Sequence, residues 1–176
     1  MKWLLLIAGI FTLVAFAVLI LGLLQPVKHS VTRSIHLKQK PDTVFALLDN
    51  IADQPNWSST VMKVEPLPDR NGKPVARYTL KWGGRQMIMT QLEHKPPTRL
   101  VATMAKEGGP ILGTWTYQVV AERDGCRVSV TEEGELKNPF FRAIAGMRGL
   151  DANITQTLRD LANNFGERAD ISILVP

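Results

Sequence analysis

Three glutamates near the end of the strand-rich part of the chain are the residues best suited to acid–base chemistry. Glu132, Glu133 and Glu135 lie in one expected strand, residues 126–135. Because side chains alternate across a strand, Glu133 and Glu135 share one face and Glu132 lies on the other. A carboxyl group that faces an apolar cavity has a raised pKa and can exchange protons near neutral pH. Glu133 is the catalytic candidate, and the alternative is a solvated strand edge that pairs with Arg or Lys.

Few other polar residues are placed to contact a ligand. Arg148, four residues after Ile144 on an expected helix, is a candidate for an anionic head group at a cavity mouth, with a surface position as the alternative. The three histidines occur singly, and no His-x-x-x-His, paired cysteine or carboxylate cluster has metal-site spacing. Gly108-Gly109-Pro110 is a turn with no helix after it, which excludes a phosphate loop there. We expect neither a metal nor a cofactor.

An unbroken apolar run extends from Trp3 to Leu24. As a helix it would be roughly 33 Å long, enough to cross a hydrocarbon core of about 30 Å. The alternative, a cleaved signal peptide, has an apolar region of about 7–15 residues and a small-x-small cleavage site. The run is longer and ends without such a site. We therefore expect an uncleaved single-pass anchor, residues 1–26, in the cell membrane; the flanking basic residues do not decide its orientation.

The rest of the chain has the composition of one domain, which we place at residues 27–167, followed by a short tail at 168–176. The chain carries 21 Lys and Arg against 16 Asp and Glu, a net charge of +5, with no adjacent basic residues. That spread disfavours a nucleic-acid groove and is compatible with weak attraction to an anionic leaflet. Its only cysteine, Cys126, excludes an intrachain disulfide. Oligomeric state stays open.

Hydrophobic periodicity predicts the elements of this domain. Alternation predicts a first strand at 29–38, and Pro41 begins a short amphipathic helix that a second short helix or turn follows at 51–57. Breaker residues then separate six predicted strands, at 61–66, 75–82, 86–94, 99–105, 113–122 and 126–135. The pair Gly83-Gly84 suits a two-residue hairpin. Short connections of this kind predict an antiparallel meander.

One long amphipathic helix is predicted at the end of the domain. Asn138 is a suitable N-cap, Pro139 suits the first turn, and apolar residues then recur every three or four positions up to Gly166. Gly146 and Gly149 weaken the first half, which indicates a bend or a close backbone approach. The fold class is therefore α+β, a curved antiparallel sheet of about seven strands with a long helix across it.

A cavity can open where such a sheet curves away from its helix, and apolar side chains would line it. Alternation groups Tyr78 with Leu80 and Trp82, and Trp115 with Tyr117; in strand 86–94 both faces are apolar, so its inner face stays undecided. For each residue, packing in a solid core is the alternative. The cavity candidates are Tyr78, Leu80, Trp82, Met89, Met104, Trp115, Tyr117, Ile144, Met147 and Arg148.

The order strand, two short helices, strand meander and terminal helix resembles the helix-grip fold of the START-related SRPBCC superfamily, which includes polyketide cyclase/dehydratase-like and lipid-transfer domains. The stretches 31–45, Trp57-Ser58 and 113–135 carry the likeness. The resemblance covers about residues 29–166 and implies a hydrophobic or amphipathic ligand held between sheet and helix. It does not imply a shared reaction.

Three functions remain open from the sequence. The preferred one is a membrane-anchored, non-enzymatic module that binds or transports a lipid-like molecule. The second is a cyclase- or dehydratase-like enzyme that uses a cavity carboxylate. The third is a structural or partner-binding domain with a filled interior, which predicts no cavity larger than a few water molecules.

Overall fold

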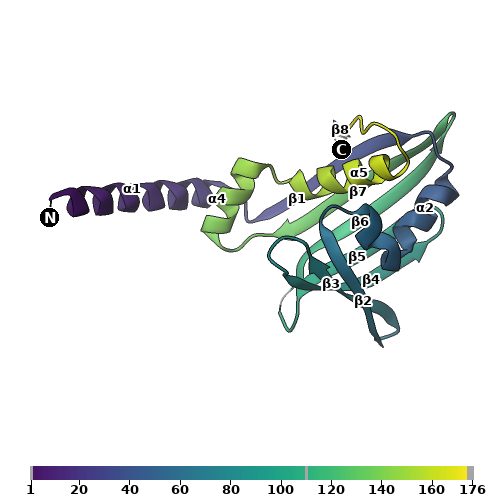
Figure 1. The fold of residues 1–176 in the computed structure, drawn as a ribbon, viewed down its shortest axis with the longest axis horizontal. Helices are drawn as coiled ribbons and strands as arrows, with labels where there is room; N and C mark the ends of the chain where they lie inside the picture. Colours follow the sequence, from purple (N-terminus) through teal and green to yellow (C-terminus); the bar gives the residue numbers. More distant parts are fainter. Residues whose placement is uncertain (1, 110, 174–176) are drawn as a thin grey trace. The chain divides into compact units, whose positions relative to one another are not determined.

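The computed structural model describes residues 2–109 and 111–173, which form two compact units (Figure 1). The first unit contains the chain up to His29 together with Glu135–Leu150. The second contains Ser30–Gly134 and the chain from Asp151 onward.

One antiparallel sheet of eight strands dominates the described part of the second unit. In space the strands follow the order β2-β3-β4-β5-β6-β7-β1-β8, so the meander from β2 to β7 is as predicted. The strands are β1 (Lys28–Leu37), β2 (Val61–Arg70), β3 (Lys73–Leu80), β4 (Gln86–Lys95), β5 (Arg99–Lys106), β6 (Ile111–Glu122), β7 (Gly125–Glu135) and β8 (Ser172–Ile173). The short β8 lies in the C-terminal tail, where no element was predicted.

The turns between the strands depend on glycine, but one predicted turn is wrong. Asn71 and Gly72 both have positive φ and form the tight turn between β2 and β3. Gly83 and Gly84 also have positive φ, yet the connection between β3 and β4 is longer than two residues. The reason is that β3 ends at Leu80, whose N–H bonds to the carbonyl oxygen of Arg85 at 2.9 Å and closes a wider loop.

Three short helical segments connect β1 to β2, where two had been predicted. They are the helix α2 (Pro41–Asp49), the 3-10 turn η1 (Ile51–Asp53) and the helix α3 (Gln54–Trp57). Proline occupies the first turn of α2, where the missing N–H costs no helical hydrogen bond. Val44, Phe45 and Leu48 form the buried face of α2.

The prediction of one long terminal helix is wrong, because the segment forms two helices. They are α4 (Pro139–Arg148), in the first unit, and α5 (Ala152–Asn164), in the second. Gly149 separates them with a φ of 86°, a backbone conformation that a helix cannot contain and that glycine adopts without strain. The apolar spacing continues through this break, so periodicity alone could not reveal it.

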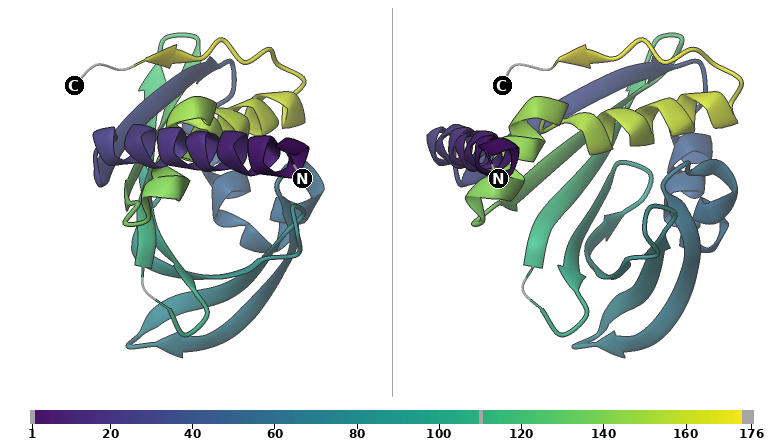
Figure 2. Two further views of the ribbon diagram at one scale, coloured as in Figure 1. Left: turned by 90° about the vertical axis from the view of Figure 1, so that its left-hand side faces the viewer. Right: turned by 60° about the vertical axis from the view of Figure 1, so that its left-hand side comes forward.

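The helix α5 packs on the sheet and forms the main core of the second unit (Figure 2). Its residues Ile154, Leu158 and Leu161 are fully buried. They join one cluster with inner-face residues of the strands, including Ile35 and Val128. Burial of each such side chain contributes on the order of 2 kcal/mol, so this contact fixes α5 in place.

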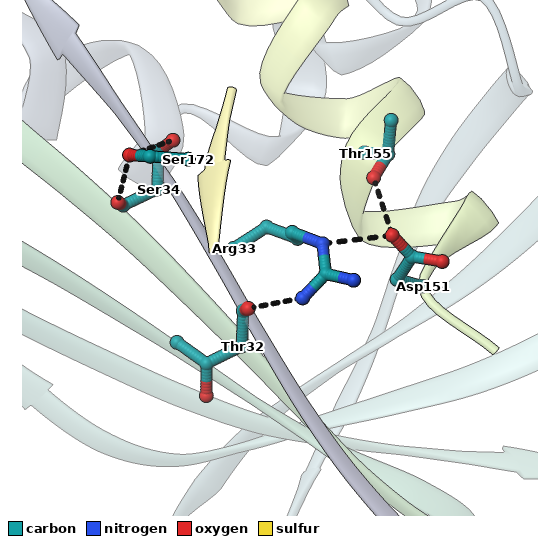
Figure 3. Close-up of polar contacts among 6 residues, drawn as sticks. All are labelled: Thr32, Arg33, Ser34, Asp151, Thr155 and Ser172. Carbon is teal, nitrogen blue, oxygen red and sulfur yellow. Dashed lines mark hydrogen bonds and ion pairs between the residues drawn. The ribbon is translucent and has the colours of Figure 1, made fainter. Parts of the chain in front are cut away.

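Polar contacts fix the start of α5 relative to β1 (Figure 3). The Nε of Arg33 donates to the Oδ2 of Asp151 at 2.8 Å, and the hydroxyl of Thr155 donates to the same oxygen at 3.3 Å. Asp151 stands at the N-cap of α5, where a negative charge is favourable. Ser34 and Ser172 share a hydrogen bond that holds β8 against β1.

In the first unit, the helix α1 (Lys2–Leu24) meets α4 through an unusual polar contact. Pro26 has no N–H, so the carbonyl oxygen of Gly22, four residues earlier, lacks its helical donor. Arg142 supplies one, because its Nε donates to this oxygen at 2.7 Å. The same guanidinium donates to the carbonyl oxygens of Leu136 and Lys137, and Arg142 is only 6% exposed. A cation at a helix C-terminus also stabilises the helix dipole.

Gly22 permits this contact because it has no side chain. A Cβ atom on Gly22 would lie 1.8 Å from the carbonyl oxygen of Pro139, at the start of α4, whereas a Cβ atom on Gly9 would meet nothing within 4 Å. Gly22 was not among the glycines for which a close approach was predicted, which were Gly146 and Gly149. At Gly146, a Cβ atom would lie 3.1 Å from the side chain of Gln25.

We predict that Gly22→Ala separates α4 from α1, although alanine favours a helix by about 1 kcal/mol over glycine. Amide hydrogen exchange of residues 140–148, measured on the full chain in detergent micelles, should become faster. Gly9→Ala makes the same chemical change on the same helix and should leave that exchange unaltered. Equal exchange in the two variants would contradict the assigned contact.

Candidate functional site

Two neighbouring pockets lie over the half of the sheet formed by β3 to β6. The first has a volume of about 30 Å³, and its walls come from these strands and from α2, η1 and α3. The second has a volume of about 60 Å³. Both are lined by Ile51, Met89, Leu100 and Ala102, so these four residues separate the two spaces. Each pocket is large enough for a few water molecules.

The wall between the pockets contains an adaptable side chain. Met89 is unbranched and has three rotatable bonds, so it can change rotamer where a β-branched residue could not. Met104 adds a second methionine to the first pocket.

Two polar groups of the first pocket have no hydrogen-bond partner among the described residues. They are the hydroxyl of Tyr78, whose residue is 1% exposed, and the Oε1 of Gln54. A buried hydroxyl without a partner costs on the order of 1–3 kcal/mol. Burial raises the pKa of Tyr78, and the nearby Tyr117 raises it further. Tyr78 therefore stays protonated, and its O–H is available as a donor to a ligand or to water.

A buried carboxyl group adjoins this pocket. Glu132 is 7% exposed and is paired in register with Trp115, a wall residue. Burial raises the pKa of Glu132 to about 7, although hydrogen bonds from Trp115 and from Asn153 of α5 favour the charged form. Burial, and to a smaller extent the charge of Glu132, raises the pKa of Tyr117 to about 12. Glu132 can therefore take up or release a proton near neutral pH, in reach of wall residues.

The structure brings together five of the predicted cavity residues. Tyr78, Met89, Met104, Trp115 and Tyr117 all line the first pocket. The presence of Met89 there, and of Gln91 in the second pocket, identifies the inner face of β4.

The other candidates lie elsewhere. Leu80 is half-buried and lines neither of these pockets, and Trp82 is 86% exposed in the loop after β3. Ile144, Met147 and Arg148 belong to α4 in the first unit, and their place in a cavity stays a prediction. The two pockets also differ from the expected position beneath the terminal helix, because no residue of α5 lines them.

Glu133, the catalytic candidate, is exposed, and Glu132 is the glutamate on the inner face. Alternation correctly separated these two residues, but only the register with β6 shows which one meets Trp115. Gln54 and Ala102 were not predicted. The sequence carries no signal that singles out Ala102, since the same strand also contains Ala105.

Comparison with known proteins identifies the family. The family described as polyketide cyclase / dehydrase and lipid transport matches residues 28–166. The chain therefore belongs to this family, which is part of the START-like SRPBCC superfamily, and its helix-grip fold agrees with that membership. A search of curated proteins finds no match.

Solved structures share the fold at low sequence identity. The Zhui aromatase/cyclase from Streptomyces sp. R1128 has a TM-score of 0.63 at 12% identity, over 78% of this chain and 93% of that one. The di-domain aromatase/cyclase StfQ of the steffimycin biosynthetic pathway also has a TM-score of 0.63 at 12% identity, over 77% of this chain. This chain spans about half the length of StfQ. A START superfamily protein from Mycobacterium smegmatis has a TM-score of 0.58 at 14% identity, over 77% of this chain and 96% of that one.

We predict that the stability of the protein depends on pH through Glu132. The folded-state pKa is raised from 4.5 to about 7. Between these values the unfolded chain binds fewer protons than the folded one, so unfolding becomes easier as the pH rises. Burial of the charged carboxylate therefore lowers the free energy of unfolding. This loss is absent below pH 4.5 and complete above pH 7, where it approaches roughly 3 kcal/mol.

Glu132→Gln should remove this cost. In urea unfolding of the full chain in detergent, the variant should be more stable than the parent at pH 8, and the difference should shrink toward pH 4.5. Glu133→Gln, on the exposed face of the same strand, is the matched control and should show no such trend. A stability difference for Glu132→Gln that is constant with pH would contradict the raised pKa.

Proposed function

We propose that this protein is a membrane-anchored binding domain that takes up or transports a hydrophobic or amphipathic, lipid-like molecule. The observation that carries the proposal is the first pocket, in which apolar and methionine side chains surround the hydroxyl of Tyr78, a group that no described residue hydrogen-bonds. Small-molecule sites combine apolar walls with a few polar groups in this way. The family, whose description includes lipid transport, supports the same class of ligand.

The pocket volumes set a condition on this proposal. Spaces of about 30 and 60 Å³ do not hold a fatty acid or an isoprenoid without side-chain movement. Rotation of Met89 and displacement of Ile51 would join and enlarge them. Ligand entry is therefore expected to accompany rearrangement of this wall and of the short helical segment above it.

The membrane location of the proposal depends on α1. It is the one described helix that is long and apolar enough to cross a membrane, a property that a signal sequence shares. Arg142 favours retention of α1, because cleavage after the apolar run would remove the Gly22 carbonyl from a buried guanidinium. An anchor would hold the pocket where lipid-like molecules are concentrated.

A second candidate function is a cyclase- or dehydratase-like enzyme, favoured specifically by Glu132. Its pKa of about 7 suits a general acid or base, and Trp115 connects it to the pocket wall. In that mechanism the apolar walls would orient the substrate, Tyr78 would donate a hydrogen bond, and Glu132 would move the proton. The Zhui aromatase/cyclase has the same fold, which by itself does not transfer the reaction.

Native mass spectrometry of the detergent-extracted full chain distinguishes these functions. A stoichiometric bound lipid that exchanges with added palmitate or farnesol without conversion supports the carrier. Turnover of an aromatic polyketide that Glu132→Gln abolishes supports the enzyme. A chain that binds none of these compounds would support the third reading, a structural domain with a filled interior.

We predict that Ala102→Leu prevents ligand binding. Ala102 lines both pockets, so a leucine there fills the space that a ligand would use. The loss of affinity for palmitate or farnesol should be at least about tenfold, while thermal stability is unchanged or higher because a cavity is filled.

Ala121→Leu is the matched control, since Ala121 is exposed near the end of β6. The same substitution there should leave binding unaltered. Equal affinity in the Ala102→Leu and Ala121→Leu variants would show that the ligand binds elsewhere.

A further inference from the structure

The helix α4 exposes an apolar face that its own unit does not cover. Phe140, Phe141, Ile144 and Met147 are 44%, 58%, 44% and 67% exposed. Their spacing of one, three and three residues places them on one side of a helix. Arg142 and Gly146, which contact α1 and Gln25, lie on another side. One face of α4 therefore contacts α1, and the apolar face beside it is exposed.

The contact with α1 determines which surroundings the uncovered face meets. Pro139, the first residue of α4, approaches the backbone of Gly22, which is two residues before the end of the apolar helix α1. At about 1.5 Å per residue, Gly22 lies roughly 3 Å inside the apolar segment. If α1 spans a bilayer, α4 therefore begins at the boundary between hydrocarbon and head groups.

The charges on and beside α4 agree with that position. No Asp or Glu occurs between Glu135 and Asp151, whereas Lys137 and Arg148 are exposed at the two ends of the helix. Long basic side chains reach from an interfacial helix to the head groups, and they favour anionic lipids. Phenylalanine, isoleucine and methionine on the adjoining side suit the acyl-chain boundary.

We infer that α4 is an interfacial membrane helix that lies in the leaflet where α1 ends, with Phe140, Phe141, Ile144 and Met147 in contact with lipid. This inference rests on the membrane-spanning role of α1 in the proposed function. It adds a second membrane contact to the chain, one that Arg142 and Gly22 hold at a fixed place beside the anchor. The occupant of the apolar face is then the bilayer itself and not a protein partner.

Site-directed fluorescence on the full chain tests the inference. Single replacements Phe141→Cys and Ile144→Cys carry an environment-sensitive NBD label, and the protein is reconstituted in vesicles of phosphatidylcholine and phosphatidylglycerol. Burial raises the pKa of the native Cys126 to about 11, so this thiol stays unlabelled at neutral pH. Asp124→Cys, in the exposed turn between β6 and β7, reports an aqueous position. Leu13→Cys, in the middle of α1, reports insertion of the anchor.

Labels at 141 and 144 should be quenched by a lipid with a nitroxide near its head group and protected from aqueous iodide. The label at 124 should show the reverse. Quenching by iodide at 141 and 144 would overturn the inference, as would shielding from both quenchers, which indicates a protein partner or a second copy. The label at position 13 distinguishes failure of the anchor from failure of the inference about α4. If a nitroxide lipid labelled deep in its acyl chain does not quench it, α1 does not span the bilayer, and both the anchor and the inference are wrong. If it is quenched, the labels at 141 and 144 test α4 alone.

Discussion

The packing of α5 against the inner face of β1, β6 and β7 is the contact on which the second unit depends. Three fully buried side chains of one helix meet valine and isoleucine side chains of the strands in one closely packed cluster. The Arg33–Asp151 pair and the bonds from Ser59 to Asp160 hold the two ends of α5 in register with the rest of the unit. The inner face of β1, β6 and β7 is thereby covered by α5.

The other half of the sheet, around β3 to β5, has a smaller hydrophobic cluster. A separate, smaller cluster around Ala76, Tyr78, Met89 and Ala102 lies there, covered by short helical segments whose few side chains cannot fill the concave surface. The space that remains is apolar, contains the hydroxyl of Tyr78, and adjoins the carboxyl group of Glu132. The two described pockets lie at this half of the sheet, and Glu132 of β7 lies at its border with the α5 core, where it hydrogen-bonds to Asn153 of α5.

Much of the fold is predictable from the sequence because its signals are local. Period-two alternation and the proline at the start of α2 act within a few residues and produced the expected strands and helix, whereas Gly83 and Gly84 lie in a wider loop than the predicted hairpin. Gly146 and Gly149 indicated a bend in the terminal helix, but its full division was not predicted, because apolar spacing continues across Gly149, whose positive φ depends on tertiary context. The site was only partly predictable. Aromatic and methionine residues mark the inner face of a strand, but the choice of Glu132 over Glu133 depends on register with Trp115. The position of the pocket depends on which half of the sheet α5 covers, a long-range property that no local pattern contains.

We propose that an apolar molecule binds over β3 to β5, in the half of the sheet that α5 does not cover. Photo-crosslinking with a diazirine-bearing palmitate, followed by peptide mapping of the full chain in vesicles, tests this proposal directly. We expect adducts on peptides that contain Tyr78, Met89 or Ala102, in addition to those on any segment that contacts the membrane. Adducts confined to α1 and α4, with none on these strands, would contradict it.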